Sequence, residues 1–334
     1  MPTQTLEDIR SNGLLQCLFQ PIYSLCEQQI LGYEALSRGP EDSPLFTPLQ
    51  LFAAARETAQ LCDLDSFCRQ LACSRFRQLQ LQGLLFLNVS PESLLDPEHK
   101  PGRTLKLIDS LGLCPSNVVI ELTEHAPGQD FALLENALRH YRAMGFRIAL
   151  DDLGSGFSSL RLWSELRPDY VKIDRHFIQG IHQDAVKREF VSSIVKMAGA
   201  SRAQVIVEGV EQREELTTLI NLGVDLVQGF LLCEPQAFPP LQAGNILTQL
   251  LPPANTPPVD EKPLLSLLLQ QSGVNQGAQI NDVLQRFHQQ ANLNSLVVLD
   301  SKGRPVGIVH RQPLAEAMLR PFAQDLLGRK PITR

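Results

Sequence analysis

The sequence predicts an α/β protein, a TIM-like (β/α)8-type barrel with a small α/β extension at its C-terminal end. Two observations carry this prediction. Between about Leu15 and Leu232, short apolar runs of strand type alternate with longer amphipathic stretches of helix type, which is typical of parallel α/β folds. Most of the apolar runs also end in an acid, an amide or a lysine, and the carboxyl ends of barrel strands converge on one mouth.

The apolar runs are continuous rather than alternating, as expected for strands that are buried on both faces. They are 15–20, 30–36, 84–90, 118–124, 147–153, 170–174, 205–211 and 226–230. Polar residues end seven of these runs, whereas a doubly wound sheet would gather such residues only near its switch point. A closed ring of parallel strands is therefore the simpler geometry.

Amphipathic stretches between the runs predict the covering helices. They are 48–78, 131–145, 184–200 and 212–223. The first stretch opens with Thr47-Pro48, a capping residue followed by proline at the first helical position. Gly145 and Gly223 stand where glycine often ends a helix.

The chain changes character after the barrel pattern ends. Residues 251–263 hold five prolines in thirteen positions, which predicts an extended linker. Further on, residues 295–311 predict two strands around a turn at Ser301-Lys302-Gly303. We therefore expect a barrel domain over 1–250, a linker over 251–263 and a small segment over 264–334. A core of roughly 70 residues is small, so this segment is expected to be half of a larger module or part of a dimer contact.

Composition places the chain among ordinary globular proteins, with 43% hydrophobic and 20% charged residues. The net charge of −6 argues against binding to polymeric nucleic acid, which requires a basic face. It does not exclude a small nucleotide held by metal ions. The seven cysteines include no CxxC pair, which favours reduced thiols. The sequence also lacks a membrane span and a signal-like start, so we expect a cytoplasmic protein.

The polar residues at the strand ends point to metal chemistry. They are Glu34, Asn88, Glu121, Asp151 with Asp152, Lys172, Glu208 and Gln228. Converging buried carboxylates repel one another and require a cation. Carboxylates with one amide suit Mg²⁺ or Mn²⁺ rather than zinc. The adjacent pair Asp151 and Asp152 can hold two ions, as in enzymes that hydrolyse phosphodiesters, and Lys172 can orient the water or neutralise charge on the phosphorane.

Seven short motifs in one order then carry a family resemblance over residues 13–248. They are Glu34-Ala35-Leu36-Ser37-Arg38, Asn88-Val89-Ser90, Glu121-Leu122-Thr123-Glu124, Asp151-Asp152-Leu153-Gly154-Ser155-Gly156, Lys172-Ile173-Asp174, Glu208-Gly209-Val210-Glu211 and Gln228-Gly229-Phe230. In these motifs the chain resembles the EAL-domain phosphodiesterases of bacterial cyclic di-GMP signalling. The resemblance implies hydrolysis of cyclic di-GMP to linear pGpG by a water activated between two Mg²⁺ or Mn²⁺ ions. It also implies a homodimer through the barrel, and Ca²⁺ is expected to inhibit because its looser coordination misplaces the water.

The resemblance also implies a role for each matched residue. The implied metal ligands are Glu34, Asn88, Glu121, Asp151, Asp152 and Glu208. The implied catalytic residues are Lys172, Glu208, Asp152 and Gln228. The implied substrate contacts are Gln20, Glu34, Leu36, Arg38 and Asp174. Asp174 serves equally well as a helix cap, so that role stays open.

Glu124 is implied to anchor the loop that follows Asp152. This loop, DDLGSGFSSL at 151–160, departs from the usual DDFGTGYSSL of the family at Leu153, Ser155 and Phe157. Each replacement keeps the character of the usual residue, and the two glycines that permit the turn are retained. We expect the loop to fold over the second metal ion.

The tail resembles the first half of a cystathionine-β-synthase-type (CBS) module on the strength of residues 293–311. Such modules work in pairs, so the resemblance implies further CBS or cyclase domains beyond Arg334. Two rivals to the hydrolase remain. One is a catalytically weak sensor or effector module that binds cyclic di-GMP. The other is a barrel metalloenzyme that enolises carboxylates, against which Arg38 argues.

Overall fold

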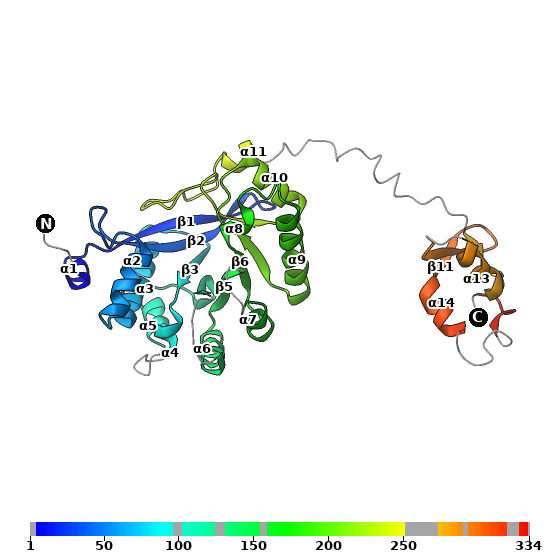
Figure 1. Ribbon diagram of the computed structural model, residues 1–334, viewed down its shortest axis with the longest axis horizontal. Coiled ribbons are helices and arrows are strands. Elements are labelled where there is room, and N and C mark those ends of the chain that lie inside the picture. The colour runs from blue at the N-terminus through cyan, green and yellow to red at the C-terminus, as the bar shows by residue number, and fades with distance from the viewer. Residues whose placement is uncertain are drawn as a thin grey trace. The chain divides into compact units, whose positions relative to one another are not determined.

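The computed structural model describes residues 5–95, 102–123, 131–153, 159–250, 273–289, 293–318 and 327–332 (Figure 1). The chain divides into two compact units, Met1–Ala254 and Asn255–Arg334. Each unit is described by itself. The linker predicted over 251–263 lies outside the described residues.

Eight strands close into a barrel in chain order, which confirms the predicted fold class. They are β1 (Gln16–Ser24), β2 (Gln29–Arg38), β3 (Leu84–Asn88), β4 (Val118–Thr123), β5 (Arg147–Leu153), β6 (Tyr170–Ile173), β7 (Gln204–Val207) and β8 (Leu226–Val227). Each neighbouring pair from β2 to β8 is parallel. Their carboxyl ends therefore share one mouth of the barrel.

Strand β1 departs from the prediction of an all-parallel ring. It runs antiparallel to both β2 and β8. Only residues 25–28 separate β1 from β2, and a parallel pair would need a crossover of a dozen or so residues. As a result, Gln20 stands opposite Glu34 from the middle of β1 rather than from a carboxyl end.

The helices of this unit follow the strands, as the alternating pattern predicts. They are α1 (Leu6–Ser11), α2 (Pro48–Glu57), α3 (Leu61–Gln78), α4 (Pro91–Leu95), α5 (Arg103–Ser110), the 3-10 turn η1 (Pro115–Asn117), α6 (Phe131–Ala143), α7 (Ser159–Leu166), α8 (Arg175–Ile178), α9 (Ala185–Ser201), α10 (Arg213–Asn221) and α11 (Ile246–Leu250). The stretch 48–78 is two helices rather than one, because the chain turns at Ala59, where φ is +55°. Thr47 caps α2 as expected, since its hydroxyl accepts the Gln50 amide at 3.3 Å.

The barrel interior below the mouth is apolar. Its buried residues are Ile22, Leu84, Phe86, Val119, Ala149, Tyr170, Ile206 and Leu226. On five successive strands from β3 to β7, and again on β8, an interior residue precedes a polar strand-end residue by two positions, as Phe86 precedes Asn88. Because side chains alternate between the two faces of a strand, the polar residues also face inward, one layer nearer the mouth.

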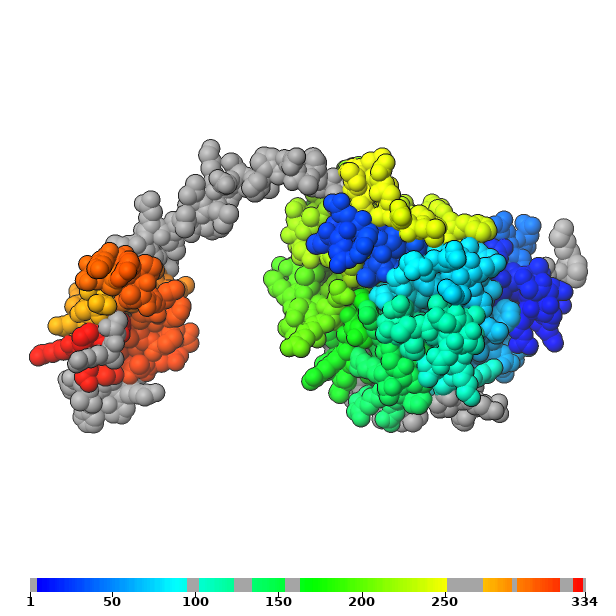
Figure 2. Space-filling model, turned by 180° about the vertical axis from the view of Figure 1, so that it is seen from behind, coloured from blue at the N-terminus to red at the C-terminus, as the bar shows by residue number. Residues whose placement is uncertain are grey.

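The segment after β8 returns across the outside of β1 and β2. The backbones of Phe19 and Gln236 exchange hydrogen bonds of 2.8 and 2.9 Å. Tyr33 Oη donates to Pro240 O at 2.8 Å, and Arg75 Nη2 donates to Ala237 O at 2.8 Å. Figure 2 shows this yellow segment beside the blue strands and cyan helices. The segment therefore packs against β1, β2 and α3.

The second unit is built on a small sheet with the strand order β11-β10-β9. Its elements are β9 (Val274–Asn275), α13 (Ile280–Gln289), β10 (Ser295–Leu299), β11 (Pro305–His310) and α14 (Arg311–Met318). Strands β10 and β11 pair antiparallel around the predicted turn at 301–303, which confirms that hairpin. The resemblance of this unit to a CBS module stays a prediction. Among all the described helices of the chain, none combines the length and apolar character that a membrane crossing requires.

Candidate active site

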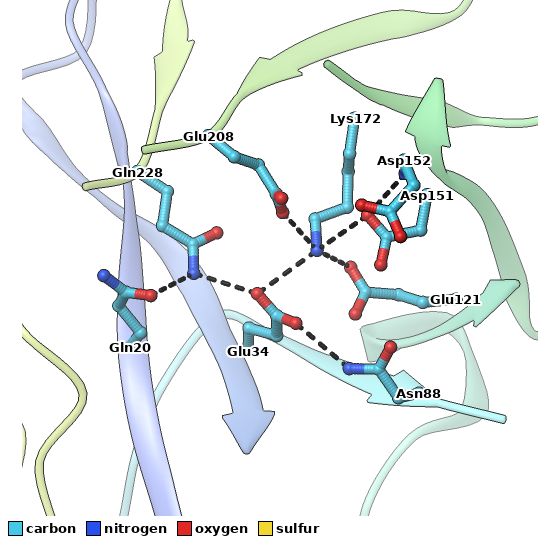
Figure 3. A network of polar contacts seen from close by, with 9 residues as sticks. All are labelled: Gln20, Glu34, Asn88, Glu121, Asp151, Asp152, Lys172, Glu208 and Gln228. Atoms are coloured by element: carbon cyan, nitrogen blue, oxygen red, sulfur yellow. Dashed lines mark hydrogen bonds and ion pairs between the residues drawn. The ribbon is translucent and has the colours of Figure 1, made fainter. Parts of the chain in front are cut away.

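The polar strand-end residues gather at the mouth around Lys172, whose side chain is fully buried (Figure 3). Its Nζ lies 2.6 Å from Glu208 Oε1 and 2.8 Å from Glu121 Oε1. It also lies 3.2 Å from Glu34 Oε2 and 3.4 Å from Asp151 Oδ1. One ammonium therefore faces four carboxylates that come from four different strands or strand ends.

Amide side chains hold Glu34 from both sides. Asn88 Nδ2 donates to Glu34 Oε1 at 3.0 Å, and Gln228 Nε2 donates to Glu34 Oε2 at 2.9 Å. Gln228 Nε2 also donates to Gln20 Oε1 at 2.8 Å. Gln20 in turn donates to the Cys233 carbonyl at 2.9 Å. The structure thus brings Gln20, Asn88 and Gln228 together with the acids.

The acids form two groups that share Asp151. One group is Glu34, Glu121 and Asp151, and the other is Asp151, Asp152 and Glu208. In each group, one carboxylate oxygen from every residue lies within 4.8 Å of the corresponding oxygens of the other two. Neighbouring residues of a regular strand point to opposite faces. Asp152 escapes this rule because its φ is +56° and the register of β5 shifts between Leu150 and Leu153. This local irregularity lets two adjacent aspartates serve one site.

Burial sets the protonation of these groups. It raises the pKa of Asp151 to about 6 and raises the pKa of Glu121 and of Glu208 well above a carboxyl group's usual range, against the charge of Lys172. Burial also acts to raise the pKa of Glu34, but Lys172 and the amide donors outweigh it and lower this pKa. Burial would lower the pKa of Lys172, yet the surrounding carboxylates raise it well above its usual value. The lysine therefore stays charged, whereas Asp151, Glu121 and Glu208 hold their protons more tightly than free carboxyl groups do.

The donor set fits divalent cations. Glu121 Oε2 and Gln228 Oε1 are buried and have no hydrogen-bond partner among the described residues. A buried acceptor without a donor is costly, and a bound cation would remove that cost for the carboxylate. Carboxylate and amide oxygens are the ligands that hard cations such as Mg²⁺ prefer. The residues present at the mouth therefore fit one or more such ions.

A cavity of about 430 Å³ adjoins the acids. Glu34, Asn88, Asp151 and Asp152 contribute to its wall from the barrel side. Residues of α2 and α3 form the other wall: Pro48, Leu49, Phe52, Arg56, Asp65, Cys68, Arg69 and Ala72. The cavity thus combines an apolar wall with polar groups beside the acids, as small-molecule sites commonly do.

Among the other predicted substrate residues, Leu36 lines this cavity, whereas Arg38 and Asp174 are not part of its lining. Arg38, at the end of β2, is half-buried and donates through Nη1 to the neighbouring Ser37 carbonyl at 2.9 Å. Asp174 caps α8, since its Oδ1 accepts the His176 amide at 2.8 Å, which bears out the capping alternative. Glu124, Ser155 and Phe157 lie outside the described residues.

Three buried charged residues beside the site were not predicted from the sequence. Asp65 and Arg69 form an ion pair in the cavity wall, and both are almost fully buried. Glu215, which is 1% exposed, accepts backbone hydrogen bonds beside the turn that carries Glu208. The sequence does contain patterns that indicate these residues. Asp65 and Arg69 are opposite charges four positions apart on a helix, and Glu215 is an acid in the first turn of a helix.

Two of the solved structures that resemble this chain are complexes of one protein with cyclic di-GMP. The complex of BlrP1 from Klebsiella pneumoniae with manganese and cyclic di-GMP matches with a TM-score of 0.62 and 30% identity, over 67% of this chain and 56% of that one. The calcium and cyclic di-GMP complex of the same protein matches with a TM-score of 0.62 and 29% identity, over 73% of this chain and 59% of that one.

Comparison of sequences also finds relatives that are named for cyclic di-GMP. The cyclic di-GMP phosphodiesterase RocR of Pseudomonas aeruginosa is 33% identical over 232 residues, 67% of this chain and 58% of that protein. The chain spans 27% to 53% of the length of three other curated relatives, so it corresponds to part of longer proteins. The family model of the EAL domain matches residues 3–235. The chain therefore belongs to the EAL domain family.

Proposed function

We propose that this chain hydrolyses cyclic di-GMP to linear pGpG at the mouth of its barrel. The observation that carries the proposal is the pair of acid groups that share Asp151 around the buried Lys172. Two acid groups with a common member are suited to two divalent ions, Mg²⁺ or Mn²⁺, at neighbouring positions. The relatives support the substrate, since RocR is named a cyclic di-GMP phosphodiesterase and BlrP1 was solved with that nucleotide.

The residues divide into two ligand sets under this proposal. Glu34, Asn88, Glu121 and Asp151 would hold the first ion. Asp151 and Asp152 would hold the second, with Glu208 close by. When bound, the ions supply an activated water and charge stabilisation for the leaving oxygen.

The remaining residues orient the water and the carboxylates and neutralise charge. Lys172 keeps its proton and lies within 3.4 Å of four carboxylates, so its ammonium can hold the attacking water and balance charge on the phosphorane. Gln228 and Asn88 fix the Glu34 carboxylate between them.

The substrate contacts and the wider assembly are proposals at the same level. Gln20, Leu36, Arg38 and Asp174 contact the nucleotide, and Arg38 takes a phosphate. Glu124 anchors the loop after Asp152. The domain boundaries 1–250, 251–263 and 264–334 and a homodimer through the barrel complete the proposal.

A second candidate is a sensor that binds cyclic di-GMP without cutting it. The presence of every acid, of Asn88 and of Lys172 in one contact network favours the enzyme. To separate the two, the chain is incubated with cyclic di-GMP and Mn²⁺, and the products are resolved by chromatography. We expect pGpG from the unsubstituted chain and at least about 10³-fold less from Asp151→Asn, which loses the shared ligand. Binding of cyclic di-GMP without any pGpG in Mg²⁺ or Mn²⁺ would leave the sensor as the better account.

A further inference from the structure

Glu208 differs from the other carboxylates on Lys172 in how it is supported. Glu34, Glu121 and Asp151 lie within β2, β4 and β5, whereas Glu208 follows the last residue of β7. Its side chain is also the most open of the four, at 21% exposed. A ligand on a turn depends on whatever fixes that turn, because no strand ladder holds it on both sides.

Backbone contacts fix the start of this turn. The Glu208 amide donates to Ile173 O at 3.1 Å, and the Val210 amide donates to Gln228 O at 3.1 Å. Between them, Gly209 has a φ of +67°, and a Cβ there would lie 2.4 Å from Arg175 Cβ. The turn is therefore packed closely against α8 and the end of β8.

Glu215 fixes the far end of the same turn. Its Oε2 accepts the amides of Glu211 and Gln212, each at 3.0 Å. Its Oε1 accepts the Gly180 amide, which follows α8, at 2.9 Å. The carboxylate is 1% exposed and lies in the first turn of α10, where a negative charge is favoured. One side chain thus joins the turn after β7 to the segment after β6.

We propose that Glu215 is a positioning residue, which holds the turn 208–212 so that Glu208 completes the second acid group with Asp151 and Asp152. The inference rests on the proposed function for its catalytic consequence. Glu215 touches no reacting atom, and it acts through Glu208. Loss of a group that orients a metal ligand lowers metal affinity or activity by about 10–100-fold.

Three variants test this role. Glu215→Ala removes all three acceptor bonds. Glu215→Gln keeps one carbonyl oxygen, so it can serve either the Glu211 and Gln212 amides or the Gly180 amide, but not both. Asp184→Ala is the matched control, because Asp184 accepts the amides of Val186 and Lys187 at the start of α9 and takes no part in the site.

The first readout is Mn²⁺ binding, followed by electron paramagnetic resonance. We expect Glu215→Ala to weaken the second Mn²⁺ equivalent by about 10–100-fold and to leave the first nearly unchanged. Glu215→Gln should lie between Glu215→Ala and the unsubstituted chain. Asp184→Ala should lower the melting temperature without altering Mn²⁺ binding. Equal affinity of the second equivalent in Glu215→Ala, or the absence of a second equivalent in the unsubstituted chain, overturns the inference.

The second readout is a double-mutant cycle on the turnover of cyclic di-GMP. We expect Glu215→Ala to lower kcat with little change in KM, and to have no added effect once Glu208→Gln is present. An equal loss of kcat in both backgrounds would show a general structural role instead. If the unsubstituted chain binds two Mn²⁺ ions but forms no pGpG, the proposed function fails while the Mn²⁺ arm still decides the role of Glu215.

Discussion

At the scale of single residues, the site crowds several acids around one buried ammonium. Lys172 contacts four carboxylates, and Asp152 adds a fifth acid next to them. Burial keeps Asp151, Glu121 and Glu208 from ionising as readily as free carboxyl groups. Without added cations, this crowding of acids therefore lowers the stability of the folded chain. Divalent ions would remove that cost, and they are also the ions that the proposed hydrolysis requires.

Lys172→Ala should lower kcat by about 10²–10³-fold, the effect of removing one group that stabilises charge in the transition state. It should also lower the melting temperature of the metal-free chain, because four buried carboxylates lose their common counter-charge. Turnover of cyclic di-GMP and thermal unfolding in chelator measure the two effects. Lys172→Met is the control for side-chain volume, and normal turnover in either variant would remove the lysine from the mechanism.

The affinity for Mn²⁺ should depend on pH. With a pKa of about 6, Asp151 holds a proton below that pH in the metal-free chain, and an incoming ion must displace it. Apparent affinity should therefore fall by at least about tenfold for each pH unit below 6. The raised pKa values of Glu121 and Glu208 act in the same direction. Calorimetric titrations between about pH 5 and pH 8, a range that brackets the Asp151 pKa of about 6, check this, and constant affinity across the range would contradict it.

Most residues that gather at the mouth could be predicted because each stands where an apolar run ends, and the carboxyl ends of barrel strands converge. The roles of these residues come from the family motifs and stay predictions. Glu215 could not be found in this way, because its function depends on three backbone amides from two separate segments. The left-handed backbone of Asp152 was equally hidden, since nothing in the residue type demands it.

At the scale of elements, the direction of β1 was the main error. Run length and apolar content do not encode direction, and the alternating pattern suggested a parallel ring. The short link at 25–28 was the available signal. The break between α2 and α3 was missed for a similar reason, because an alanine at φ +55° carries no turn signature.

The turn between β7 and α10 offers a test at this scale. Gly209→Ala should cost about 1–3 kcal/mol of stability, because alanine at φ +67° is strained and its Cβ would meet Arg175. It should also lower kcat through the displacement of Glu208. Gly199→Ala is the control, since a Cβ there meets nothing within 4 Å and a helical alanine should add about 0.5–1 kcal/mol. Chemical denaturation measures the change in stability, and formation of pGpG measures the change in kcat. If Gly209→Ala kept the stability and kcat of the unsubstituted chain, the turn would not be constrained.

At the scale of the whole molecule, the chain separates into a barrel unit that holds the described acids of the site and a small second unit. A barrel with its own core is expected to fold by itself. A chain ending at Ala254 should therefore keep the kcat of the full chain within about twofold, as measured by formation of pGpG. A large loss of turnover would instead assign the second unit a part in the reaction.

Hydrolysis of cyclic di-GMP by this chain is expected to require two divalent ions at the shared acid groups. The direct measurement is a titration of the metal-free chain with Mn²⁺ in which bound ion and pGpG are quantified in the same samples. We expect almost no product while one ion is bound and a rate that rises with the second equivalent. Ca²⁺ should support binding of cyclic di-GMP but not turnover. Full turnover with one ion, in chelator or in Ca²⁺ alone would contradict it.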